Sequence, residues 1–103
     1  MNGSSASITF QNNRLMVSGD LGFQTVMHVW AQSLPLLAQA NTVSELQFDL
    51  SNVISSDSAG LALLLEWVKY AKRINRKISF QYLPAQLNSI IAVAGISDLI
   101  SLS

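Results

Sequence analysis

Apolar and polar residues alternate along three parts of the chain, and this period of two predicts β-strands. The first part, SITFQNNRLMVSG, contains two alternating runs separated by Asn12-Asn13. Asparagine tolerates positive φ, so this part predicts a β-hairpin with a tight turn, and a further turn is expected at 19–22. The other two parts, ELQFDL at 45–50 and ISFQYL at 78–83, each predict a single strand.

Between these strands the apolar residues recur every three or four positions, which predicts helices. The helical segments run from about 23 to 40, over 58–75 and over 85–94. Pro84 can start the last helix, because proline is tolerated in a first helical turn, and Gly95 is a plausible C-cap for it.

The first helical segment contains Pro35, which lacks an amide hydrogen and disfavours helix in the residue before it. Two alternatives follow from its position. The helix kinks at Pro35, or a second short helix begins there with Ser33 as its cap.

The resulting element order is β-β-α-β-α-β-α, which predicts a single α/β domain with helices packed on a mixed sheet. The domain is expected to span 7–103, after a flexible N-terminus at 1–6 whose residues are small and polar. The tail DLISLS is expected to form a last short strand or helix.

The long helix over 58–75 carries two apolar faces. At about 100° per residue, one face is formed by Leu61, Leu64, Leu65 and Val68, and it is expected to pack on the sheet. The second apolar face consists of Leu63, Trp67, Tyr70 and Ile74. Either neighbouring helices cover this second face, or Trp67 and Tyr70 are exposed and dock a partner, as aromatic residues often do. At the end nearest Ser58 we favour the partner.

Composition excludes several classes of function. The chain has 103 residues, 50% of them hydrophobic, and a formal net charge of zero, which argues against non-specific nucleic-acid binding. It has no cysteine, which excludes disulfides, thiol catalysis and zinc–thiolate sites. No signal peptide or membrane-spanning run is apparent, so the protein is expected to be soluble, without direct membrane insertion, or peripheral through its partners.

Catalytic and cofactor sites are not expected. The only histidine, His28, lies in the first helix, and since there is no cysteine a metal site would need carboxylates alone around it, so we expect none. Asp20, Asp49 and Asp57 could converge at the end of the sheet, where paired carboxylates can perform acid–base chemistry. The Gly19-Asp20-Leu21-Gly22 segment lacks the spacing and the lysine of a phosphate-binding loop.

Five of the six basic residues are clustered late in the long helix and just after it. They are Lys69, Lys72, Arg73, Arg76 and Lys77. Cations near a helix C-terminus suit the helix dipole, which is the preferred interpretation. The alternative is contact with acidic lipid headgroups or an acidic partner.

The polar cluster SSDS at 55–58 comes directly before the most apolar segment. Asp57 or Ser58 is a good N-cap for the helix. Gly60 in the first turn costs roughly 1 kcal/mol relative to alanine, which suggests that something approaches the backbone closely. Ser58 can therefore be a cap, a phosphorylation switch whose phosphate would meet free amide groups, or a small contact in an interface.

These residues resemble those of a known family. The strand LQFDLSNV, the turn Asp-Ser-Ala-Gly and the leucine-rich helix are similar to the STAS domain, found in bacterial anti-sigma factor antagonists and sulfate-transporter cytoplasmic domains. The resemblance spans essentially the whole chain and includes VSGDL at 17–21. Within the family, GLALLLEWVKYAK at 60–72 is most similar to the MlaB type, a small cytoplasmic subunit of phospholipid-transporting ABC complexes of Gram-negative bacteria.

The resemblance implies which residues act. The family's phosphorylatable or interface position maps onto Ser58, its preceding acid onto Asp57 and its helix-start glycine onto Gly60. The early motif departs from many antagonists, which carry a second acidic residue where this chain has Gly22. The whole expected contact set is Ser56, Asp57, Ser58, Ala59, Gly60, Leu63, Trp67 and Tyr70, with Asp20 as a supporting loop residue.

The implied function is non-enzymatic and needs no cofactor. The chain is expected to bind the ATPase subunit of a phospholipid-transporting ABC complex in the cytoplasm, peripheral to the inner membrane, and to support its assembly or activity. The alternative is an anti-sigma factor antagonist that is switched by phosphorylation of Ser58. The sequence leaves the oligomeric state open.

Overall fold

A computed structural model describes residues 5–40 and 43–96 of the chain. It contains four strands and three helices in the order β-β-α-β-α-β-α, which confirms the predicted α/β class and mixed sheet. The elements are β1 (Ala6–Gln11), β2 (Arg14–Leu21), α1 (Val26–Gln39), β3 (Glu45–Ser56), α2 (Ser58–Arg73), β4 (Lys77–Gln81) and α3 (Ala85–Ala94). The expected element in the tail DLISLS lies outside the described residues, as do residues 1–4 of the expected flexible N-terminus.

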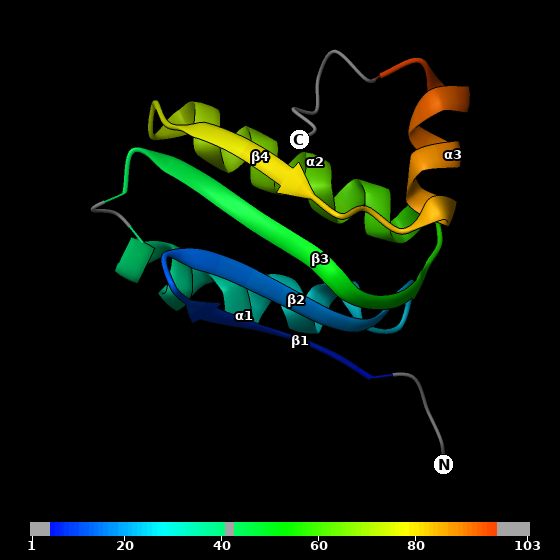
Figure 1. Cartoon of the computed structure of the whole chain (residues 1–103), viewed down its shortest axis with the longest axis horizontal. Coiled ribbons are helices and arrows are strands. Elements are labelled where there is room, and N and C mark those ends of the chain that lie inside the picture. Colours follow the sequence, from blue (N-terminus) through cyan, green and yellow to red (C-terminus); the bar gives the residue numbers. More distant parts are fainter. Residues whose placement is uncertain (1–4, 41–42, 97–103) are drawn as a thin grey trace.

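The sheet has the order β1-β2-β3-β4. β1 is antiparallel to β2, whereas β2, β3 and β4 are parallel to one another. The connections through α1 and α2 each join parallel neighbours, and such crossovers are right-handed. Both step in the same direction across the sheet, so α1 and α2 lie on the same face of it, while α3 stands at one end (Figure 1).

The hairpin at the start of the chain is confirmed. Asn12 and Asn13 have φ of 53° and 62°, the left-handed values that a two-residue hairpin turn requires. The turn expected at 19–22 is wrong in its position, because β2 continues to Leu21. Gly19 has φ of 95°, and the pairing of β2 with β3 shifts between Gly19 and Asp20, so the glycine produces a bulge rather than the end of the strand.

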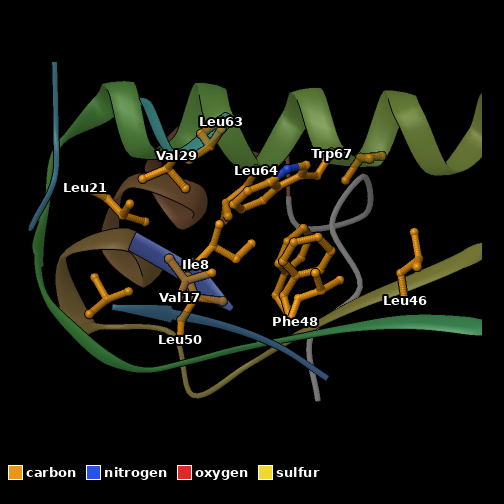
Figure 2. Close-up of a cluster of buried hydrophobic side chains, with 14 of the residues drawn as sticks. Ile8, Val17, Leu21, Val29, Leu46, Phe48, Leu50, Leu63, Leu64 and Trp67 are labelled. Carbon is orange, nitrogen blue, oxygen red and sulfur yellow. The ribbon is translucent and has the colours of Figure 1, made fainter. Parts of the chain in front are cut away.

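The core lies between the sheet and the two long helices, and Trp67 projects into it from α2 towards Phe48 (Figure 2). Its ring centroid lies 4.4 Å from that of Phe48, which in turn lies 5.3 Å from that of Phe80. Trp67 is 0% exposed, so the expectation that it lies on the surface for a partner is wrong. The spacing of the apolar residues is the same whether a neighbouring helix or a partner covers this face of α2. In the structure, α1 packs on α2 and buries the indole.

A buried hydrogen-bond chain joins the two helices. The indole Nε1 of Trp67 donates to Ser33 Oγ over 3.0 Å, and Ser33 Oγ donates to the carbonyl oxygen of Trp30 over 2.6 Å. Ser33 is fully buried within α1, so it is not the cap of a second helix. α1 runs through Pro35 as a single helix, and the alternative of two separate helices is therefore wrong.

The face through which α1 packs agrees only in part with its apolar spacing, which predicted the series Phe23, Val26, Trp30, Leu34 and Leu37. Leu37 is buried, and Val26 and Trp30 are partly buried against the core. The expected series began at Phe23, which precedes the helix and is 85% exposed, and it included Leu34, which is also exposed. The buried positions of α1 are Val29, Ser33 and Leu37. Because the polar Ser33 interrupts the apolar spacing of this buried face, the sequence pattern alone does not identify the face.

The remaining helices agree with expectation. On α2, Leu61, Leu64 and Val68 are buried against the core and Leu65 is partly buried. α3 begins after Pro84, as predicted. It ends at Gly95, whose φ of 69° makes it the left-handed C-cap. No helix in residues 5–40 and 43–96 is both long and apolar enough to cross a membrane.

We predict that the hydrogen bond between Trp67 and Ser33 makes a measurable contribution to stability. In Ser33→Ala the indole N–H stays buried without its acceptor, which should lower the free energy of unfolding by about 1–3 kcal/mol. Urea unfolding followed by circular dichroism would measure the change. Ser89→Ala is the matched control, because Ser89 is also helical but exposed. Equal stability of the two variants would contradict the prediction.

Candidate functional site

The junction between β3 and α2 consists of one residue, Asp57. β3 is longer than the expected 45–50 and continues to Ser56, so the polar cluster lies partly on a strand. The Asp57 carboxylate accepts a hydrogen bond from the backbone N–H of Ala59 over 2.8 Å and caps α2. Ser58 is therefore the first helical residue rather than the cap, and it is exposed.

Asp57 also fixes the segment that precedes α1. Its backbone N–H donates to the carbonyl oxygen of Leu21 over 3.1 Å. Its second carboxylate oxygen accepts from the backbone N–H of Phe23 over 3.4 Å. One acidic side chain thus links the start of α2 to the segment between β2 and α1.

Asp20 contributes at the same end of the sheet, as expected for a supporting residue. Its carboxylate accepts a hydrogen bond from Ser55 Oγ over 2.6 Å, which joins the ends of β2 and β3. Its carbonyl oxygen accepts from Thr25 Oγ1 over 2.6 Å, and Thr25 is buried at the start of α1. Sequence reasoning missed Thr25, whose hydroxyl bonds Asp20 rather than capping α1, and it singled out Ser55 only as a member of the polar cluster at 55–58.

A further residue at this end comes from α3. Gln86 Oε1 accepts a hydrogen bond from the backbone N–H of Ser56 over 3.0 Å. No local pattern in the sequence indicates this contact, because the two residues are thirty positions apart. The junction is thus held by groups from β2, α1 and α3 together.

The residues around the junction line a polar hollow of about 430 Å³. It is lined by Asp20, Leu21, Gly22, Phe23, Gln24, Thr25, Ser55, Ser56 and Asp57. Asp20 and Asp57 therefore lie at one site, but Asp49 does not join them. Asp49 of β3 pairs with Met16 near the start of β2, whereas Ser55 of β3 pairs with Asp20 at the end of β2. About six strand residues, roughly 20 Å, therefore separate Asp49 from the end of the sheet where Asp20 lies. The expected convergence of three carboxylates is wrong.

Asp49 has a local structural role instead. It lies 3.3 Å from Arg14 Nη1 and accepts from the backbone N–H of Ser51 over 2.8 Å. Burial acts to raise the pKa of Asp49, but the Ser51 hydrogen bonds and the Arg14 charge outweigh it and hold that pKa below its usual value. Within the described ranges no group of three or more His, Asp or Glu side chains could hold a metal ion.

Gly60 is approached closely, but by the protein itself. A Cβ atom at Gly60 would meet Ser56 Oγ and would lie 3.1 Å from the carbonyl oxygen of Leu21. The glycine is buried and allows α2 to start directly against the ends of β2 and β3. The close approach expected at the Gly60 backbone is therefore confirmed, whereas its role as a partner contact stays a prediction.

An apolar groove lies between α1 and α2, beside Ser58. We call it the α1–α2 groove; its volume is about 390 Å³, and it is lined by Val26, Met27, Trp30, Ala59, Ala62, Leu63 and Glu66. Met27 is 75% exposed, and Ala62 is also exposed. Of the expected contact set, Ala59 and Leu63 line this groove. Sequence reasoning missed Met27 and Ala62, because a single apolar residue on an outer helix face gives no distinctive signal.

The residues of the second apolar face of α2 differ in burial and do not form one surface. Leu63 is only 4% exposed, and Trp67 reaches neither the groove nor the surface. Tyr70 is partly buried, with the Arg73 guanidinium 5.7 Å from its ring centre. Tyr70 is twelve residues, about 18 Å, from Ser58 along the helix, so it does not belong to the same site.

The basic cluster lies at the opposite end of α2 from Ser58. Lys69 pairs with Glu66 over 3.2 Å. Arg76 donates to the carbonyl oxygens of Ala40 and Val43, which fixes the segment after α1. Part of this cluster therefore stabilises the fold.

Comparison with known proteins identifies the family. The model of a family described as "Mlab, STAS domain" matches residues 4–101, so the chain belongs to the STAS domain family. It is similar to the Intermembrane phospholipid transport system binding protein MlaB of Haemophilus influenzae, with 29% identity over 89 residues that cover 84% of each chain.

Two solved structures show the same fold. The anti-sigma factor antagonist SpoIIAA in its unphosphorylated form has a TM-score of 0.61 at 12% identity, covering 92% of this chain and 83% of that one. The structure of SLC26A9 has a TM-score of 0.66 at 18% identity, and the match covers 82% of this chain but only 16% of that one. At these identities the similarity shows the fold alone.

We predict that Asp57 stabilises the junction through its carboxylate. Asp57→Ala removes the N-cap and the contact to Phe23, which should lower the free energy of unfolding by about 1 kcal/mol. Asp57→Asn is the matched comparison, because asparagine also caps helices and should retain most of the stability. Chemical denaturation of both variants would measure the difference, and an alanine variant as stable as the wild type would refute the capping role.

Proposed function

We propose that this chain is a non-enzymatic interaction subunit that binds the ATPase of a phospholipid-transporting ABC complex of the Mla type. It would act in the cytoplasm of a Gram-negative bacterium, peripheral to the inner membrane, and support assembly or activity of the complex. In that role it would help to maintain outer-membrane lipid asymmetry. The family match and the name of the Haemophilus influenzae relative support this assignment.

The observation that carries the proposal is the α1–α2 groove beside the small residues at the start of α2. Met27 lines the groove, Phe23 precedes it by four residues, and both side chains are mostly exposed. Exposed apolar groups in one place are typical of interaction sites, and methionine adapts its shape to a partner. Ala59 and Ala62 leave room for a side chain of the partner to enter.

Charge adds to the description of the partner. Glu66 lines the groove, where Lys69 pairs with it over 3.2 Å, whereas Asp57 and Asp20 line the polar hollow. A surface with an apolar side chain for the groove and a cationic group for the carboxylates of the hollow would be complementary. Ser58, Ser56 and Asp57 would then lie at the edge of the interface, where a small hydroxyl allows close approach.

We predict that filling the groove weakens partner binding without unfolding the protein. Ala62→Arg places a long charged side chain where Ala62 now leaves space, and Ala62 is exposed, so the fold should persist. The ATPase subunit should bind at least about tenfold more weakly, a loss of about 1.4 kcal/mol. Ser58→Arg should have the same effect. Co-purification and isothermal titration with the ATPase would measure it.

The control for both substitutions is Val93→Arg, which adds the same charge on α3 at a position that is 89% exposed. It should bind the ATPase like the wild type. Wild-type affinity in a folded Ala62→Arg variant would overturn the groove as the binding site. Failure of the wild-type protein to bind the ATPase would overturn the proposed function itself.

The second candidate function is an anti-sigma factor antagonist regulated by phosphorylation. The observation that favours it is the exposed Ser58 at the first position of α2, where free backbone amides of the first turn would stabilise a phosphate. The similarity to SpoIIAA supports this function only through the fold.

Intact-mass spectrometry of the protein from its native cell separates the two functions. The transporter function predicts an unmodified Ser58 under several growth conditions. A phosphate on Ser58 that disappears in Ser58→Ala would favour the antagonist. Ser56→Ala is the control, because Ser56 is a serine only two residues before Ser58, at the edge of the polar hollow.

A further inference from the structure

β1 forms one edge of the sheet, and β2 is its only strand neighbour within the described residues. In Figure 1 β1 runs along the lower margin, and no described element lies beyond it. On one side, the N–H and C=O groups of its backbone therefore have no strand partner among residues 5–40 and 43–96. Such an edge is a template for another strand.

The register identifies the residues that point to this edge. Gln11 and Arg14 are paired across the two-residue turn, which makes them a hydrogen-bonded pair. Hydrogen-bonded and non-hydrogen-bonded pairs alternate along an antiparallel ladder. The backbone groups of Ala6, Ile8 and Phe10 consequently point away from β2.

β1 lacks the features that usually protect an edge strand. Its sequence, ASITFQ, has no charged residue, no proline and no glycine, and its six pairs with β2 follow one another without a bulge. The opposite edge, β4, also has no proline, glycine or bulge, but it differs from β1 in two respects. It begins with the exposed Lys77 and is followed by Tyr82, whose φ of 59° breaks the extended backbone.

We propose that β1 pairs in antiparallel orientation with β1 of a second copy of this chain, joining the two sheets into one. The pairing is centred on Ile8, so that Ile8 faces Ile8 of the second copy and Ala6 faces Phe10 of the second copy. The three outward-pointing residues are evenly spaced about Ile8, so every edge N–H and C=O finds a partner in this register.

Side chains on both faces fit this register. On the outer face Ser7 lies opposite Thr9 of the second copy, and two small hydroxyl side chains can approach without steric conflict. On the core face Phe10 is only partly buried in the single chain. A second copy would cover it further. The residues of the α1–α2 groove lie on α1 and α2 and none lies on β1, so the proposed dimer contact and the groove share no residue.

Opposite and like charges at the Ser7–Thr9 contact provide the first test. Sedimentation equilibrium of the purified chain over increasing concentration should show a mass that rises from 11.2 kDa towards twice that value. Ser7→Lys/Thr9→Lys places like charges opposite each other twice and should weaken the dimer roughly tenfold. Ser7→Glu/Thr9→Lys has the same bulk but opposite charges, so the dimer should persist.

Cross-linking provides the second test, because the chain contains no cysteine. A mixture of Ser7→Cys and Thr9→Cys proteins should form a disulfide between the two chains under mild oxidation, since residues opposite each other in a ladder lie within disulfide range. Each variant alone should cross-link far less, because in this register Ser7 lies opposite Thr9 of the second copy and neither position lies opposite itself.

Two results would overturn the proposal. One is a monomer at every concentration together with no disulfide in the mixture. The other is a dimer that the like-charge variant does not weaken, which would place the contact elsewhere. Thr9 is exposed and Ser7 points away from the core, so each variant should fold. Thermal unfolding of each variant would check this.

Discussion

The structure depends on the burial of one tryptophan between the sheet and two helices. Trp67 comes from α2, stacks on Phe48 of β3 and donates its indole proton to Ser33 of α1. The stacking fixes the distance of α2 from the sheet, whereas the hydrogen bond fixes α1 beside α2. Since a buried N–H without an acceptor is costly, α1 must place Ser33 at this point of its surface and no other. The relative position of the two helices, and hence the groove between them, follows from this contact.

The second constraint is the single-residue junction between β3 and α2. A strand that passes into a helix within one residue brings the helix start against the neighbouring strand end. Gly60 makes this approach sterically possible, and Asp57 caps the amides that the abrupt start leaves unpaired. Hydrogen bonds from Thr25 to Asp20 and from Ser56 to Gln86 then tie α1 and α3 to the same end of the sheet.

The parts of this arrangement that the sequence predicts are those set by local physics. The hairpin follows from two asparagines that accept positive φ, and the core face of α2 follows from helical periodicity. Packing between elements that are distant in the sequence cannot be predicted from local patterns in the same way. The second apolar face of α2 has the same spacing whether α1 or a partner covers it, so the spacing alone does not reveal that Trp67 is buried. The predicted β3 is too short, because Ser51 and Asn52 interrupt its apolar pattern where the strand continues beside β2.

Residues whose identity the fold does not explain are the better candidates for a functional role. Asp57, Gly60, Thr25 and Gln86 each have a structural reason to be present, so their identity carries little information about a partner. Ser58 differs, because Asp57 already caps the helix and the Ser58 side chain makes no hydrogen bond with the described residues. Met27 and Phe23 contribute little to the core, yet they keep large apolar side chains in water. Folding gains nothing from this exposure, so these are the side chains that the partner proposed above would cover.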